Sequence, residues 1–278
     1  MKVLRADSAG ACYGVQRALD LAYAAVEEHE SLASLGPLIH NPIVVDELEA
    51  KGLHVAATPD EVEQDVALIR SHGVTPEVKR ALEQRCEVVV DATCPHVLRA
   101  QKASGKLASQ GRTVVVAGEA DHPEVEGLCA WCKDAGGTCL VVSDAQELPD
   151  DLAGPVGVVA QTTLPRNIYD DVVEKLEGRG LDVQAVCTVC DATRARQDAA
   201  RELSRRVDCM VVIGGRNSSN TRRLHDICTE AAPRSILVES AADLEESQFT
   251  GVKTVGVTAG ASTPEGQIAA VEDCLRCW

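Results

Sequence analysis

A cysteine, a glycine 24 residues later and a hydroxyl or imidazole side chain 28 residues later occur together three times in the chain. Each cysteine ends an apolar run and is followed by a run whose apolar residues have helical spacing. The three sets are Cys12, Gly36 and His40; Cys94, Gly118 and His122; and Cys190, Gly214 and Ser218. Three equal spacings predict an internal threefold repeat, in which each copy is one supersecondary unit.

The second half of each repeat also recurs, with looser spacing. Two strand-like runs separated by an acidic segment are followed by a polar loop and a proline, where a helix is expected to begin. The polar loops carry His72, Thr162 and Ser262, the prolines are Pro76, Pro165 and Pro264, and the expected N-caps are Thr75 and Thr263. Each repeat therefore has two polar loops, and each loop follows a predicted strand.

Strands that alternate with helical runs of about 10–15 residues are typical of parallel α/β units, whose functional loops lie at the carboxyl ends of the strands. The third repeat lacks a trailing strand, whereas residues 1–12 form a leading strand with no unit before it. We therefore expect an α/β pseudo-threefold trefoil with parallel sheets. Its lobes are expected at 13–94, 95–187 and 188–278, the last completed by residues 1–12, with the three repeat cysteines at the centre.

Charge and composition disfavour several classes of partner. The formal net charge of −16 argues against a nucleic-acid or anionic-membrane surface, and an aromatic content of 2% leaves few platforms for stacking bases. No apolar stretch approaches the ~18 residues of a membrane helix, and no secretory leader pattern follows Met1. We expect a cytoplasmic protein whose twelve cysteines are reduced thiols, metal ligands or redox groups rather than a disulfide framework.

Three thiolates at equivalent repeat positions suit a [4Fe–4S] cluster held at three irons, with the fourth iron open to a ligand. An open iron implies chemistry, since a simple electron carrier normally supplies four cysteines. Two other interpretations remain: a zinc site completed by one imidazole, and cysteines that are only small buried residues. Cys187 forms a local CTVC pair with Cys190, but only Cys190 keeps the repeat spacing, so we choose it as the ligand with Cys12 and Cys94.

The polar loops supply imidazoles, hydroxyls and an amide, a donor set that suits the oxygens of a diphosphate at helix N-termini. These residues are His40, His72, His122, Thr162, Ser218, Ser219, Asn220 and Ser262. Glu124 lies two residues from His122 and could supply a proton, with the Thr162 hydroxyl as its partner. We expect Glu126, in the same stretch, to be a solvated helix residue.

Nine stretches in one order resemble the 4-hydroxy-3-methylbut-2-enyl diphosphate reductase family, from about Cys12 to Glu265. They are ACYGVQRA, IHNPIVVDEL, SHGV, DATCP, HPEVEG, QTTL, CDATRARQ, NSSNTRRL and VGVTAGAST. The resemblance implies three α/β lobes around an oxygen-sensitive [4Fe–4S] cluster held by Cys12, Cys94 and Cys190. It also implies that Glu124 is the proton donor.

The resemblance further implies the reaction. The substrate's hydroxyl binds the open iron, its diphosphate is held by the histidine, serine and asparagine residues named above, and Thr162 assists Glu124. Electrons from ferredoxin or flavodoxin, together with protons, remove the hydroxyl as water and give isopentenyl and dimethylallyl diphosphates, in the last step of the methylerythritol phosphate route. Two other classes remain: a non-redox Fe–S hydro-lyase, which needs no reductant, and a colourless zinc-binding structural or ligand-sensing protein.

Overall fold

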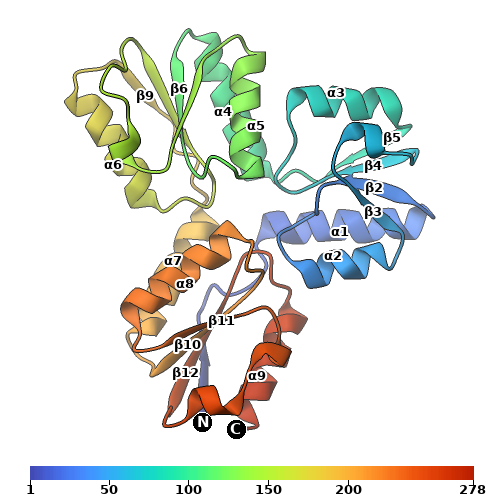
Figure 1. Ribbon diagram of the computed structural model, residues 1–278, viewed down its shortest axis with the longest axis vertical. Helices are drawn as coiled ribbons and strands as arrows, with labels where there is room; N and C mark the ends of the chain where they lie inside the picture. The colour runs from blue at the N-terminus through green and yellow to red at the C-terminus, as the bar shows by residue number, and fades with distance from the viewer. The chain divides into compact units, whose positions relative to one another are not determined.

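The computed structural model describes all 278 residues, and Figure 1 shows helices and strands alternating along the chain. The strands form three sheets of four strands each, and every strand pair is parallel. The predicted α/β class with parallel sheets is therefore confirmed. None of the helices has both the length and the apolar character that a membrane span requires.

The three sheets share one strand order. The strands are β1 (Lys2–Arg5), β2 (Leu32–Leu35), β3 (Leu53–Ala56), β4 (Val66–Ile69), β5 (Val88–Asp91), β6 (Thr113–Ala117), β7 (Cys139–Val142), β8 (Val156–Ala160), β9 (Val183–Ala185), β10 (Cys209–Ile213), β11 (Ser235–Val238) and β12 (Thr254–Ala259). The sheet orders are β3-β2-β4-β5, β7-β6-β8-β9 and β11-β10-β12-β1. In each sheet the two central strands, β2 and β4, β6 and β8, or β10 and β12, are followed by the polar loops. The edge strand beside β4, β8 or β12 is followed by a repeat cysteine. In the third sheet β1 occupies this edge.

Helices cover both faces of each sheet. They are α1 (Tyr13–Glu28), α2 (Pro42–Glu49), α3 (Pro76–Arg85), α4 (Pro95–Ser109), α5 (Pro123–Asp134), α6 (Arg166–Gly178), α7 (Asp191–Ser204), α8 (Ser219–Ala231) and α9 (Glu265–Arg276), with short 3-10 helices at Pro59–Glu61, Ala145–Glu147, Ala241–Asp243 and Glu246–Phe249. Figure 1 shows α4 and α5 on one face of the second sheet and α6 on the other. The layers meet through buried aliphatic side chains, such as Leu107 against Val116 on one face and Val172 against Val115 on the other. Each such side chain contributes about 1.5–3 kcal/mol on burial.

The chain forms two compact units by its internal contacts. The first comprises Met1–Gln16, Ile39–Val45 and Asp191–Trp278, and it contains the third sheet with α7, α8 and α9. The second comprises Arg17–Leu38 and Asp46–Cys190, and it contains the first two sheets with α3, α4, α5 and α6. This division does not test the predicted lobe boundaries, which stay a prediction.

The repeat glycines follow the first central strand of each sheet and allow a close approach there. A Cβ on Gly118, after β6, would lie 2.8 Å from Val125 Cγ2 and 2.9 Å from Gln161 Cβ. A Cβ on Gly214, after β10, would lie 2.7 Å from Thr221 Oγ1, and Gly214 also has a φ of +145°. A larger residue would push the next helix away from the strand ends, so these glycines determine the path of the polar loops.

One of the two expected helix caps differs from the structure. Thr75 caps α3 as predicted, since its side chain accepts a hydrogen bond from the backbone N–H of Val78 at 3.3 Å. For α9 the N-cap is Pro264 and the prediction of Thr263 is wrong. The Thr263 hydroxyl instead donates to the carbonyl of Ile213 at 3.1 Å, so it ties the loop to the end of β10.

The cysteines form no disulfide framework, but one pair departs from the expectation of reduced thiols. Cys129 of α5 and Cys139 of β7 are joined by a disulfide, 10 residues apart in sequence. The other ten cysteines form no disulfide. The bond ties the middle of α5 to the edge strand that follows it.

Candidate functional site

The three repeat cysteines lie at the starts of helices. Cys12 directly precedes α1, Cys94 is the N-cap of α4 and Cys190 directly precedes α7. Their backbone N–H groups donate to carbonyls in the polar loops: Cys12 to Ala261 (3.2 Å), Cys94 to Ser71 (2.9 Å) and Cys190 to Thr162 (3.0 Å). Each cysteine is therefore held in the same way, beside one of the loops that carry the second set of predicted site residues. Cys12 belongs to the first unit, and the other two belong to the second.

The surroundings of these three cysteines suit metal ligation. They are partly exposed, so their sulfur atoms are accessible to a metal. Elsewhere in the chain, burial raises the pKa of the Cys86 and Cys132 thiols above the ordinary value and that of Cys209 and Cys228 to about 11, which disfavours the thiolate form that ligates metal. The donor set at the helix starts fits an iron–sulfur cluster, and the buried thiols do not.

Glu124 is a buried carboxyl in the first turn of α5, with 2% of its surface exposed. Its Oε1 accepts from the backbone N–H of Thr162 at 2.6 Å, and its Oε2 accepts from the Thr162 hydroxyl at 2.8 Å. Burial raises the pKa of Glu124 to about 7, although both hydrogen bonds from Thr162 lower it. At neutral pH a substantial fraction of such carboxyls holds a proton, so Glu124 can act as a general acid.

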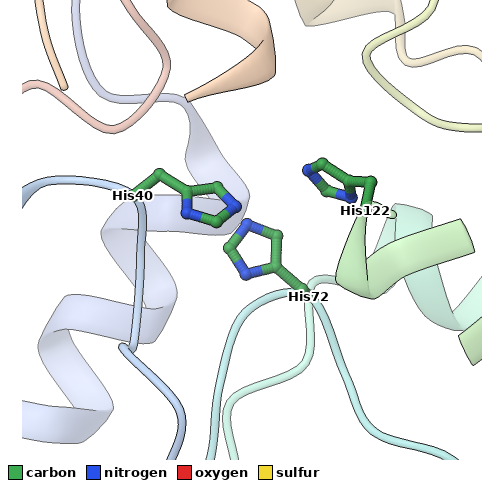
Figure 2. A group of neighbouring side chains, drawn as sticks. All are labelled: His40, His72 and His122. Carbon is green, nitrogen blue, oxygen red and sulfur yellow. The ribbon is translucent and has the colours of Figure 1, made fainter. Parts of the chain in front are cut away.

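Two imidazoles lie near the start of α5 in the second unit. His122 is the N-cap of α5, and its Nδ1 accepts from the backbone N–H of Glu124 at 3.1 Å, so Nε2 carries the proton of the neutral ring. The His72 ring lies edge-on to that of His122, with ring centroids 5.5 Å apart and ring planes at 82°. Figure 2 shows both side chains. The structure thus brings His72, His122, Glu124 and Thr162 together at the ends of β4, β6 and β8.

The start of α8 in the first unit presents hydroxyls and an amide. Ser218 is the N-cap, and its Oγ accepts from the backbone N–H of Thr221 at 3.3 Å. Ser219 and Asn220 begin the helix and are buried. Asn220 is 4% exposed, and neither atom of its amide group has a hydrogen-bond partner in the protein. A buried amide without partners is costly, so a ligand at this helix start would complete its hydrogen bonding.

A residue that the sequence pattern did not single out ties the other loops of the first unit to each other. Asn41 Nδ2 donates to the carbonyl of Ser262 at 2.7 Å and to Gln267 Oε1 at 2.9 Å. The next residue back is His40, whose carbonyl oxygen would lie 2.5 Å from a Cβ on Gly215. The segments that carry His40, Ser262 and the start of α8 therefore lie close together. In the sequence, Asn41 is marked by its position beside His40 and by its place in the IHNPIVVDEL stretch.

Gln161 is a second residue that the spacing did not single out. Its Oε1 accepts from the backbone N–H of Glu119 at 2.9 Å, and its Nε2 donates to the Thr163 hydroxyl at 2.9 Å. Gln161 therefore connects the loop after β6 to the loop after β8, next to Thr162. By contrast Glu126, in the first turn of α5, is exposed, as the sequence predicted.

Comparison with known proteins gives a family match over nearly the whole chain. The model of the family described as LytB protein matches residues 3–276. The 4-hydroxy-3-methylbut-2-enyl diphosphate reductase of Geobacter sulfurreducens is 45% identical over 280 residues, which cover 99% of this chain and 97% of that protein. The enzyme of the same name from Syntrophotalea carbinolica is 43% identical over 267 residues, which cover 95% of this chain and 94% of that protein.

Solved structures agree with this match. A structure of (E)-4-hydroxy-3-methyl-but-2-enyl diphosphate reductase, described as the terminal enzyme of the non-mevalonate pathway, is 37% identical, covers both chains completely and has a TM-score of 0.73. A structure of the E-1-hydroxy-2-methyl-but-2-enyl-4-diphosphate reductase of Plasmodium falciparum is 23% identical, has a TM-score of 0.89 and covers 99% of this chain and 87% of that one. The second likeness supports the fold alone.

Proposed function

Because the chain belongs to the LytB family, whose curated relatives are 4-hydroxy-3-methylbut-2-enyl diphosphate reductases, we propose that it reduces (E)-4-hydroxy-3-methylbut-2-enyl diphosphate to isopentenyl and dimethylallyl diphosphates. Two electrons and two protons enter, the C–O bond to the hydroxyl breaks, and water leaves. The observation that carries this proposal is the buried Glu124 carboxyl, which both donors of Thr162 hold in place and whose pKa of about 7 allows it to hold a proton.

The cofactor of the proposal is one [4Fe–4S] cluster held by Cys12, Cys94 and Cys190. When bound, it supplies a Lewis-acidic iron with an open coordination position and a path for single electrons. Support comes from the equivalent placement of the three cysteines. Each lies at a helix start, and its backbone N–H donates a hydrogen bond to a carbonyl of a polar loop. Ferredoxin or flavodoxin in the cytoplasm is the proposed electron donor.

The polar loops are proposed to bind the diphosphate. The binding residues are His40, His72, His122, Ser218, Ser219, Asn220 and Ser262. The incomplete hydrogen bonding of the buried Asn220 amide supports this role, as does its place in the first turn of α8, where backbone N–H groups favour an anion. Imidazole N–H groups can donate hydrogen bonds to phosphate oxygens.

Glu124 is the proposed source of a proton for the leaving hydroxyl. The Thr162 hydroxyl holds the carboxyl in place and contacts the substrate beside it in this proposal. Because both carboxylate oxygens accept from Thr162, the side chain has one orientation rather than several. Burial keeps bulk water from exchanging that proton freely, so proton delivery depends on the carboxyl itself.

Anaerobic purification and turnover test the proposal. We expect a brown protein with about four irons per chain, which under reducing conditions converts the hydroxylated allylic diphosphate to the two isoprenoid diphosphates. A colourless protein with one zinc per chain would favour a structural or ligand-sensing role. Turnover without any reductant would favour a hydro-lyase. Either outcome, or a brown protein that forms neither product, would overturn the proposal.

Replacing Thr162 with valine is expected to shift the pH dependence of kcat/KM. Glu124 donates only when protonated, so the rate of the wild type should fall as the pH rises through about 7. The Thr162 hydroxyl stabilises the carboxylate form, and its loss raises the pKa of Glu124. A hydrogen bond to a charged group is worth about 1.5–3 kcal/mol, so the alkaline limb should move up by about one to two pH units. Thr163→Val is the matched control, and an unmoved limb in Thr162→Val would contradict the assignment.

A further inference from the structure

Each of the three helices that follow a repeat cysteine carries an arginine near its start. That arginine bonds to the backbone just before a different repeat cysteine. Arg17 and Arg99 lie five residues after Cys12 and Cys94, and Arg196 lies six residues after Cys190. Each guanidinium donates to a backbone carbonyl. The order is cyclic, because the first helix reaches the second cysteine segment, the second reaches the third, and the third reaches the first.

The first two contacts lie within the second unit. Arg17 donates from Nη1 to the carbonyl of Thr93 at 3.2 Å and from Nη2 to that of Asp91 at 3.3 Å. Thr93 directly precedes Cys94. Arg99 donates from Nη2 to the carbonyl of Cys187 at 3.2 Å, three residues before the next repeat cysteine. Arg17 is half-buried, whereas Arg99 is exposed.

The third contact lies within the first unit and is the most buried. Arg196 is 5% exposed, and its Nη2 donates to the carbonyl of Gly10 at 2.6 Å, two residues before Cys12. Its Nη1 donates to the carbonyl of Ala192 in its own helix at 2.9 Å, which fixes the fork. Gly10 has a φ of +98°, and a Cβ there would lie 2.8 Å from Ile268 Cδ1, so the segment before Cys12 packs closely against α9.

These bonds place a permanent cation beside each ligand-bearing segment in a protein of net charge −16. A guanidinium remains charged at all working pH values, and its rigid fork holds carbonyls in a defined geometry. A cluster with thiolate ligands carries negative charge that grows on reduction, and nearby positive charge favours the reduced form.

We propose that Arg17, Arg99 and Arg196 are positioning residues of the cluster site, which hold the three cysteine segments in register and raise the reduction potential of the bound cluster. This inference rests on the proposed function. The buried Arg196 has the largest effect, because solvent screens the charge of the exposed Arg99 more strongly.

Arg179 offers a matched control within the chain. It also donates to two backbone carbonyls, those of Pro149 at 2.7 Å and Leu148 at 3.3 Å, in a loop that carries no cysteine. Arg179→Gln removes the same kind of bond and the same charge, but the carbonyls of Leu148 and Pro149 that Arg179 holds lie 42 and 41 residues before Cys190. A purely structural role for these arginines would therefore give Arg179→Gln and Arg196→Gln similar effects.

The test uses anaerobically reconstituted holoprotein. In Arg196→Gln we expect the equilibrium constant for one-electron reduction by dithionite to fall about tenfold, which is about 59 mV in the potential measured by electron paramagnetic resonance. Iron loss to a chelator should be several times faster than in the wild type. Arg196→Lys retains the charge but not the fork, so its potential should stay near the wild-type value while iron loss remains fast. Arg179→Gln should match the wild type in both measurements.

An Arg196→Gln protein that equals Arg179→Gln in potential and iron loss would overturn the inference. If Arg196→Gln does not fold, as judged by circular dichroism, Arg99→Gln replaces it, because Arg99 is exposed. Arg99→Gln should then lose iron faster than the control, with a smaller change in potential, and equality with the control would again overturn the inference. A wild type that binds no cluster would instead refute the proposed function.

Discussion

Glu124→Gln is expected to lose about 10²–10⁴-fold in kcat while it keeps its full iron content, because a positioned general acid contributes a factor of that size. The amide has the shape of the carboxyl and can still accept a hydrogen bond from Thr162, so the loop should not move. It has no acidic proton to give to the leaving hydroxyl. The measurement is single-turnover and steady-state kinetics with the reduced protein, next to an iron determination on the same sample.

Glu126→Gln is the matched control, since Glu126 lies in the same helix but is exposed. It should turn over like the wild type. An unaltered rate in Glu124→Gln would remove this residue as the proton donor, and a loss of iron would mean that its role is in cluster binding.

The same variant has a second readout in stability. The folded-state pKa of Glu124 is raised from 4.5 to about 7, so its contribution to the free energy of unfolding is fully present below pH 4.5 and is lost as the pH rises to about 7. The difference corresponds to a loss on the order of 3 kcal/mol. Glu124→Gln should lack this part of the pH dependence in thermal unfolding.

Cys190→Ser is expected to have the second large effect, with loss of most of the bound iron and of turnover. Its partner in the CTVC pair, Cys187, should tolerate serine with no change in iron content. Cys187 packs against the apolar core beneath α6, near Tyr169. Cys190 lies at the start of α7, and its backbone N–H donates a hydrogen bond to the carbonyl of Thr162. Each variant replaces one thiol with a hydroxyl, and the two positions are three residues apart. Each variant is therefore a control for the other.

Iron content and the visible spectrum of anaerobically purified protein measure this effect. Retention of the cluster in Cys190→Ser together with its loss in Cys187→Ser would mean that the ligand assignment within the pair is reversed. Loss in both would mean that the segment, rather than one thiol, holds the iron.

The repeat spacing was sufficient to predict the α/β class, because periodicity and turn chemistry are local properties of a chain. Strands and helices alternate at the predicted intervals, and the polar loops follow the central strands of parallel sheets. The carboxyl ends of neighbouring parallel strands lie at one edge of a sheet, so the loops after β6 and β8 could be expected near each other. His72 and His122 follow β4 and β6, which belong to different sheets, so this rule does not account for their ring contact. The sequence also singled out Glu124 and Thr162 as a pair, and the structure joins them by two hydrogen bonds.

Local patterns were less successful where several elements compete for one side chain. Thr263 looked like a helix cap, yet its hydroxyl donates to the end of β10. Cys129 and Cys139 gave no signal of pairing, and a disulfide joins them because α5 and β7 lie side by side. In both cases the partner residue belongs to another helix or strand, so the local sequence around the first residue does not predict it.

The sequence by itself determined the threefold repeat, the parallel α/β class and the positions along the chain at which polar side chains end the strands. Only the tertiary structure decided how deeply those side chains are buried and what they touch. Burial raises the pKa of Glu124 to about 7, and Arg196 reaches the carbonyl of Gly10 across 186 residues of sequence. Desolvation and long-range hydrogen bonds depend on which surfaces meet in the fold, and no local spacing encodes that.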